Sequence, residues 1–73
     1  MLMDVRTQDE FHKGHLAGSI NIPLASIKSY RNPDKNTPIR VYCKSGGRAE
    51  RAKEILESMG YTDVTNIGGI DNR

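Results

Sequence analysis

The sequence has a single cysteine, no tryptophan, one phenylalanine and no long hydrophobic run. One cysteine excludes an internal disulfide, so nothing points to a secreted scaffold held together by disulfides. The segment from Met1 to Arg6 lacks a basic stretch followed by an apolar one, and no run approaches membrane-spanning length. We therefore expect a soluble protein, with no signal or transmembrane segment in this chain and no membrane partner.

Clusters of charge of one sign are also absent. The 11 basic and 9 acidic residues are interleaved and leave a net charge of +2. Proteins that bind nucleic acid concentrate basic residues in patches and often add aromatic side chains that stack on bases, but only 5% of this chain is aromatic. We therefore expect no nucleic-acid partner.

Strand-like and helix-like segments alternate along the chain. Short apolar stretches predict four strands, over residues 2–5, 19–22, 39–42 and 64–67. Helical patterns lie between them: a capping box at Thr7 and Glu10, residues spaced three apart over 24–30, and an amphipathic segment from Arg48 to Gly60. Parallel strands need crossover connections, which are commonly helical. The sequence therefore predicts a small α/β fold, a parallel sheet of about four short strands flanked by helices, in a single domain over residues 1–73.

Cys43 stands where the third predicted strand ends, just before the longest predicted helix. A strand, a thiol, a glycine-rich turn and a helix in this order bring backbone N–H groups and the positive end of a helix dipole to the sulfur. Such surroundings lower the pKa of a thiol, and the thiolate is the form that attacks electrophiles. We therefore predict that Cys43 is a nucleophile. The alternative is a buried free cysteine that packs as a small hydrophobic residue.

The loop after the cysteine has the features of an anion site. Its two glycines let the backbone fold close around the sulfur, with N–H groups pointing inward as an anion nest. Its lysine and arginine can stabilise both a thiolate and an anionic substrate. The alternatives are a plain turn for the glycines and a solvated first-turn residue for the arginine. The predicted substrate-binding residues are Lys44, Ser45, Gly46, Gly47 and Arg48.

Asp4 and Arg6 follow the first predicted strand. In parallel sheets ligands gather at the carboxyl ends of the strands, so these residues should face the same side as Cys43. We predict a supporting role, in which they brace or extend the cysteine loop. The alternative is a local ion pair or a solvated strand end.

A series of motifs runs through nearly the whole chain: Asp4-Val5-Arg6, Glu10-Phe11, the segment 14–23, Val41-Tyr42-Cys43 with its glycine-rich loop, Gly60-Tyr61 and Gly68-Gly69. In order and spacing these motifs resemble the rhodanese family. Within that family the chain is most similar to the small single-domain thiosulfate sulfurtransferases of the phage-shock type.

The resemblance implies a rhodanese-like fold and a catalytic cysteine, Cys43, that accepts a sulfane sulfur and holds it as a persulfide. The sulfur then passes to a thiophilic acceptor such as cyanide or a thiol. No cofactor is implied, and the partners are a small sulfur donor, thiosulfate or a persulfide, and that acceptor. A phage-shock-type protein would be periplasmic, whereas other relatives would be cytoplasmic.

Two features depart from the family pattern. Members usually carry a helix and often a strand before the segment that matches Asp4, and a further helix after the one that matches Gly69, whereas this chain starts and stops almost at those motifs. We therefore expect a minimal or truncated domain, whose exposed core edges favour self-association. The loop also has Lys44 where many catalytic relatives have arginine, and lysine offers a point charge in place of a bidentate fork.

Two other function classes stay open. One is a non-catalytic rhodanese-like module that carries sulfur or binds a partner. The other is a cysteine-type phosphatase or arsenate reductase, but those enzymes need a loop one residue longer than the one from Cys43 to Arg48. His12 and His15 lie three residues apart without further ligands at a suitable spacing, so no metal site is predicted.

Overall fold

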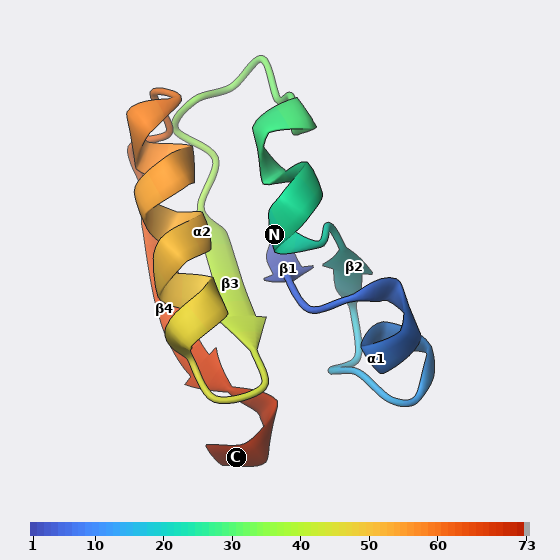
Figure 1. Cartoon of the computed structure of the whole chain (residues 1–73). Helices are drawn as coiled ribbons and strands as arrows, with labels where there is room; N and C mark the ends of the chain where they lie inside the picture. The colour runs from blue at the N-terminus through green and yellow to red at the C-terminus, as the bar shows by residue number, and fades with distance from the viewer. Residues whose placement is uncertain (73) are drawn as a thin grey trace.

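One parallel sheet forms the centre of the molecule. The computed structural model describes residues 1–72, so the predicted domain over 1–73 extends one residue, Arg73, outside the described range. The strand order is β2-β1-β3-β4, and all neighbours are parallel (Figure 1). The strands are β1 (Leu2–Asp4), β2 (Ser19–Asn21), β3 (Ile39–Cys43) and β4 (Val64–Gly69). The predicted small parallel α/β fold is confirmed.

Three helices occupy the crossovers between the strands, and a fourth, short one follows β4 in the described residues. The elements are α1 (Gln8–His12), η1 (Leu24–Ser29), α2 (Gly47–Ser58) and η2 (Ile70–Asn72). Helix α2 packs against β3, β4 and η1, whereas α1 lies near the carboxyl end of β1 (Figure 1). The start of α2, the end of β4 and helix α1 all lie at the end of the sheet where the strands have their carboxyl termini (Figure 1). The cysteine loop and α1 therefore share one end of the molecule.

The short connection over residues 24–30 is a 3₁₀ helix. Its N–H groups bond three residues back, from Ser26 to the carbonyl of Pro23 and from Tyr30 to that of Ile27. A 3₁₀ helix has three residues per turn, so side chains spaced three apart lie along one edge. Ile27 and Tyr30 accordingly face the core, and the spacing of three seen in the sequence is the period of this helix.

The core lies between β3 and α2. All residues of β3 except Arg40 are buried. Ile39, Val41 and Cys43 join three residues of the helix, Ala49, Ala52 and Leu56, in one cluster. The two alanines carry no bulk beyond Cβ, so the first turns of α2 approach the sheet closely. The helix N-terminus is thereby held against the end of β3, where Cys43 lies.

Little large apolar surface is exposed in the described part of the chain. The large hydrophobic residues classed as exposed are Met1, at 42%, and Ile20, at 43%. Self-association through exposed core edges therefore stays a prediction. None of the helices within residues 1–72 combines the length and the apolar character that a membrane crossing requires.

Candidate active site

Cys43 is the last residue of β3, and its side chain is buried. The chain then turns sharply into α2 through Gly46, whose φ of 104° lies in the left-handed region. Only glycine adopts this conformation without strain, so Gly46 allows the helix to start directly over the sulfur. The Sγ of Cys43 accepts hydrogen bonds from the backbone N–H of Gly46, at 2.9 Å, and of Ala49, at 3.4 Å.

These N–H groups change the acidity of the thiol. Burial raises the pKa of Cys43, but hydrogen bonds from the backbone N–H groups of Ala49, Gly46, Ser45 and Arg48 lower it further than burial raises it. The pKa therefore lies below the ordinary value for a thiol. Because α2 begins at Gly47, part of the predicted loop is already the first helical turn, and the positive end of the helix dipole adds to the same effect.

The end of β4 packs against the backbone of the cysteine loop. A Cβ built on Gly69 would overlap the carbonyl oxygen of Lys44 and would lie 2.5 Å from the Cα of Ser45. The backbone N–H of Asp71 also donates to the carbonyl of Lys44, at 3.2 Å. Only a residue without a side chain fits against this loop, so Gly69 is a positioning residue. The sequence indicated Gly69 only as part of a family motif.

Asn66 is a second support that sequence reasoning missed. Its Nδ2 donates to the carbonyl of Gly46 at 3.2 Å and to the carboxylate of Glu50 at 3.0 Å. Its Oδ1 accepts from the N–H of Gly68 at 2.8 Å. One amide thus joins β4, the cysteine loop and α2, although no pattern around Asn66 in the sequence indicates this role.

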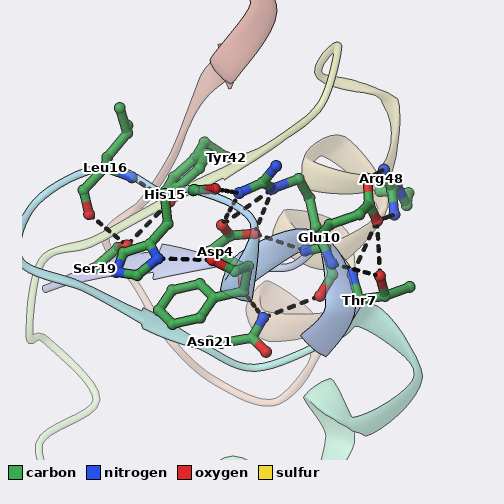
Figure 2. A network of polar contacts seen from close by, with 12 residues as sticks. Asp4, Thr7, Glu10, His15, Leu16, Ser19, Asn21, Tyr42 and Arg48 are labelled. Carbon is green, nitrogen blue, oxygen red and sulfur yellow. Dashed lines mark hydrogen bonds and ion pairs between the residues drawn. The ribbon is translucent and has the colours of Figure 1, made fainter.

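Arg48 forms a bidentate ion pair with Glu10 of α1. Its two terminal nitrogens donate to the two carboxylate oxygens, at 2.7 and 3.0 Å (Figure 2). The bond from Arg48 lowers the pKa of Glu10 to about 2, helped by the backbone N–H of Thr7. The charge of Arg48 is therefore neutralised by a residue 38 positions away. The sequence indicated Glu10 as part of a capping box and of a family motif, but not as the partner of Arg48.

Lys44 and Ser45 are exposed at the mouth of the loop. In the described residues no carboxylate lies within ion-pair distance of Lys44. Since Arg48 is paired, Lys44 is the loop cation whose charge remains available to an anionic ligand.

Asp4 and Arg6 form a buried ion pair at the carboxyl end of β1. The guanidinium of Arg6 donates to both carboxylate oxygens of Asp4, with a shortest distance of 2.7 Å. The Nη2 of Arg6, which makes that shortest bond, also donates to the carbonyl of Gly14 at 2.7 Å. The guanidinium lies 5.9 Å from the ring centre of Tyr42. The side-chain hydrogen bonds of Arg6 run to β1 and to the turn after α1, so the pair holds α1 onto the sheet next to the cysteine loop.

The two histidines lie on and after α1. The ring of His15 stacks on Phe11 with centroids 3.7 Å apart, and its Nδ1 lies 2.7 Å from the carbonyl of Phe11. Across residues 1–72 no group of three or more histidine, cysteine or acidic side chains is placed to hold a metal ion. His15 therefore packs and hydrogen-bonds within its own turn.

We expect the alkylation rate of Cys43 by iodoacetamide to rise with pH, with a midpoint below the ordinary pKa of a cysteine thiol. The reason is that the N–H groups stabilise the thiolate, which is the reactive form. The rate should be followed by intact mass between pH 5 and 10. The same protein unfolded in urea provides the control, because unfolding removes the N–H donors. A midpoint in the folded protein at or above that of the unfolded one would contradict this assignment.

Comparisons with known proteins agree with this geometry. The family model described as a rhodanese-like domain matches residues 1–72. The thiosulfate sulfurtransferase PspE of Escherichia coli is 45% identical over 71 residues, which cover 93% of this chain and 68% of PspE. The uncharacterised protein YqhL of Bacillus subtilis is 38% identical over 93% of this chain, but the chain spans only 55% of YqhL.

A solved structure described as a rhodanese with anions from E. coli matches with a TM-score of 0.89 and 43% identity, over 99% of this chain and 88% of that one. The human single-domain sulfurtransferase TSTD1 matches with a TM-score of 0.84 and 26% identity, over 93% of this chain and 74% of that one. The chain therefore belongs to the rhodanese-like family of sulfurtransferase domains.

Proposed function

We propose that this chain is a thiosulfate sulfurtransferase that carries a sulfane sulfur as a persulfide on Cys43. The observation that carries the proposal is the pair of N–H groups, from Gly46 and Ala49, that donate to the Sγ at the end of β3. They hold a thiolate ready for attack. The names of relatives such as PspE support thiosulfate as the donor class.

The proposed reaction has two displacements. The thiolate of Cys43 attacks the outer sulfur of thiosulfate, a new S–S bond forms, and sulfite leaves with the electrons of the old S–S bond. A thiophilic acceptor such as cyanide then attacks the outer sulfur of the persulfide, and the thiolate of Cys43 is restored as thiocyanate departs. Neither step needs a general base, because the attacking group is already ionised.

In the proposed reaction, other residues of the chain bind the sulfur donor and position the cysteine loop. The N–H groups of the loop stabilise the thiolate and then the persulfide anion, as an oxyanion hole stabilises developing charge. Lys44 attracts the dianionic donor and the departing sulfite. Asn66 and Gly69 keep the N–H groups aimed at the sulfur, and the buried pair of Asp4 and Arg6 holds the adjoining turn.

Intact-mass measurement after incubation with thiosulfate tests the proposal. We expect the mass to increase by one sulfur atom, and cyanide to remove that atom with release of thiocyanate. Cys43→Ser should show neither change. An unchanged mass in folded protein would overturn the proposal, and hydrolysis of an aryl phosphate that depends on Cys43 would favour phosphatase chemistry instead.

Substitution of Lys44 and substitution of Glu10, the partner of Arg48, should change the KM for thiosulfate in opposite directions. We expect Lys44→Ala to raise the KM for thiosulfate about two- to fivefold, because the unpaired cation is lost from the mouth of the site. Glu10→Gln should lower that KM by a similar factor, because Arg48 keeps its charge but loses the neutralising carboxylate. The amide oxygen of glutamine can still accept from Thr7, so α1 keeps its cap.

Steady-state kinetics with thiosulfate and cyanide measure both effects. Glu54→Gln is the matched control, because Glu54 pairs with Arg51 on the exposed face of α2. Its KM should not change. Equal KM values for wild type, Lys44→Ala and Glu10→Gln would show that N–H groups alone hold the donor.

A further inference from the structure

A cavity of about 340 Å³ lies at the opposite end of the molecule from Cys43. Its lining consists of Lys28, Arg31, Lys35, Ile55, Ser58 and Met59, and we call it the basic cavity. The helical residues belong to the last turn of α2 and its cap, whereas Cys43 is bonded by the first turn. A helix of twelve residues spans about 18 Å, so an occupant of the basic cavity leaves the mouth of the cysteine loop free.

The three cations of the basic cavity have no carboxylate partner among the described residues. The ion pairs of residues 1–72 involve other cations, namely Arg6, Arg48, Arg51 and Lys53. No acidic side chain lines the cavity either. Like charges that converge without a counter-charge repel one another, and an anionic ligand relieves that repulsion.

Two of the three cations, Arg31 and Lys35, are held in place before any ligand binds. One terminal nitrogen of Arg31 donates to the carbonyls of Lys28 and Tyr30, each at 2.8 Å, which leaves its other N–H donors to a ligand. The ammonium of Lys35 lies 4.0 Å from the ring centre of Tyr61. The backbone carbonyl of Lys35 accepts from the N–H of Thr62 at 3.0 Å, which ties its loop to the segment before β4. Such preorganisation lowers the entropic cost of binding.

Part of the lining of the basic cavity is apolar. Ile55 and Met59 are half-buried there, at the end of α2 where the helix carbonyls place negative partial charge. A bare inorganic anion would find no attraction at this part of the lining. A fitting ligand therefore places its negative groups on the cations and an apolar group on Ile55 and Met59. Because the cations come from η1 and from the loop after it, several separate carboxylates match them better than one lipid headgroup.

We propose that the basic cavity docks an acidic segment of a partner protein. Carboxylates of the segment bind Lys28, Arg31 and Lys35, and one apolar side chain of the segment packs on Ile55 and Met59. The interaction is of the kind in which electrostatic complementarity guides recognition and an apolar anchor adds affinity. This docking needs no sulfur transfer, so its failure would leave the proposed function unaffected.

Fluorescence anisotropy with a labelled peptide tests this proposal. The probe has two glutamates on each side of a central leucine. We expect saturable binding that weakens as sodium chloride is raised, and weaker binding of a peptide with serine in place of leucine. The double variant Lys28→Ala with Arg31→Ala should bind about tenfold more weakly or worse. Its thiosulfate activity should match that of wild type, which also verifies that it is folded.

Two further variants make the test decisive. Arg40→Ala removes an exposed cation of β3 that does not line the cavity, and it should change the affinity less than about twofold. Lys28→Glu with Arg31→Glu should transfer the preference to a peptide with lysines in place of glutamates. Equal weakening by Arg40→Ala, no saturable binding by wild type, or binding to phosphatidylglycerol vesicles but not to the peptide would overturn the proposal.

Discussion

Gly69→Ala is expected to lower sulfur transfer about a hundredfold while the sheet still forms. The new Cβ would overlap the carbonyl oxygen of Lys44 and crowd the Cα of Ser45, and both are backbone atoms that no side-chain rotation can move away. The loop must therefore shift, and with it the N–H groups that stabilise the thiolate of Cys43. A displacement of about 1 Å in a catalytic group costs roughly a hundredfold in rate. The measurement is kcat/KM with thiosulfate and cyanide.

The same substitution should lower the free energy of unfolding by about 1–3 kcal/mol, as overpacking of a fitted site does. Gly47→Ala is the matched control for stability, because a Cβ at Gly47 meets nothing within 4 Å and the residue already lies in a helical turn. Its urea midpoint should stay close to that of wild type. Wild-type kinetics in Gly69→Ala would show that the loop tolerates a shift, and Gly69 would lose its assigned role.

Arg6→Met is expected to destabilise the fold by about 3–5 kcal/mol, because it leaves the carboxylate of Asp4 buried without its partner. A small domain has about 5–15 kcal/mol of stability in all, so much of the folded population would be lost near body temperature. For a domain of this size we expect Tm to fall by more than about 12 °C. Thermal unfolding followed by circular dichroism measures the change.

Two companion variants separate the buried charge from other effects. Arg51→Met breaks an exposed pair, with side chains that are 67% and 59% exposed, and should cost less than about 1 kcal/mol. Arg6→Met combined with Asp4→Asn should recover part of the loss, because asparagine still accepts from the backbone N–H of Arg6 but carries no charge. If Arg6→Met unfolds no earlier than Arg51→Met, the pair does not stabilise this end of β1.

The order of the elements and the place of the thiol could be predicted from the sequence. The capping box of Thr7 and Glu10, the apolar spacing of α2 and the alternation of strands with helices are local patterns, and backbone geometry within one element is decided mainly by neighbours in the chain. The position of Cys43 between a strand and a glycine-rich turn is local too. The same local period also indicated the helix over residues 24–30, although its 3₁₀ form became clear only from its bonds.

What the tertiary structure alone decided is which side chains meet across elements. Arg48 could have faced the sulfur or solvent, but α1 brings Glu10 to it from 38 positions away. Gly69 and Asn66 support the cysteine loop only because β4 pairs beside β3 and ends under that loop. Pairings of this kind depend on strand order and on how closely α2 approaches the sheet. Both are set by burial summed over the whole core, which no short stretch of sequence contains.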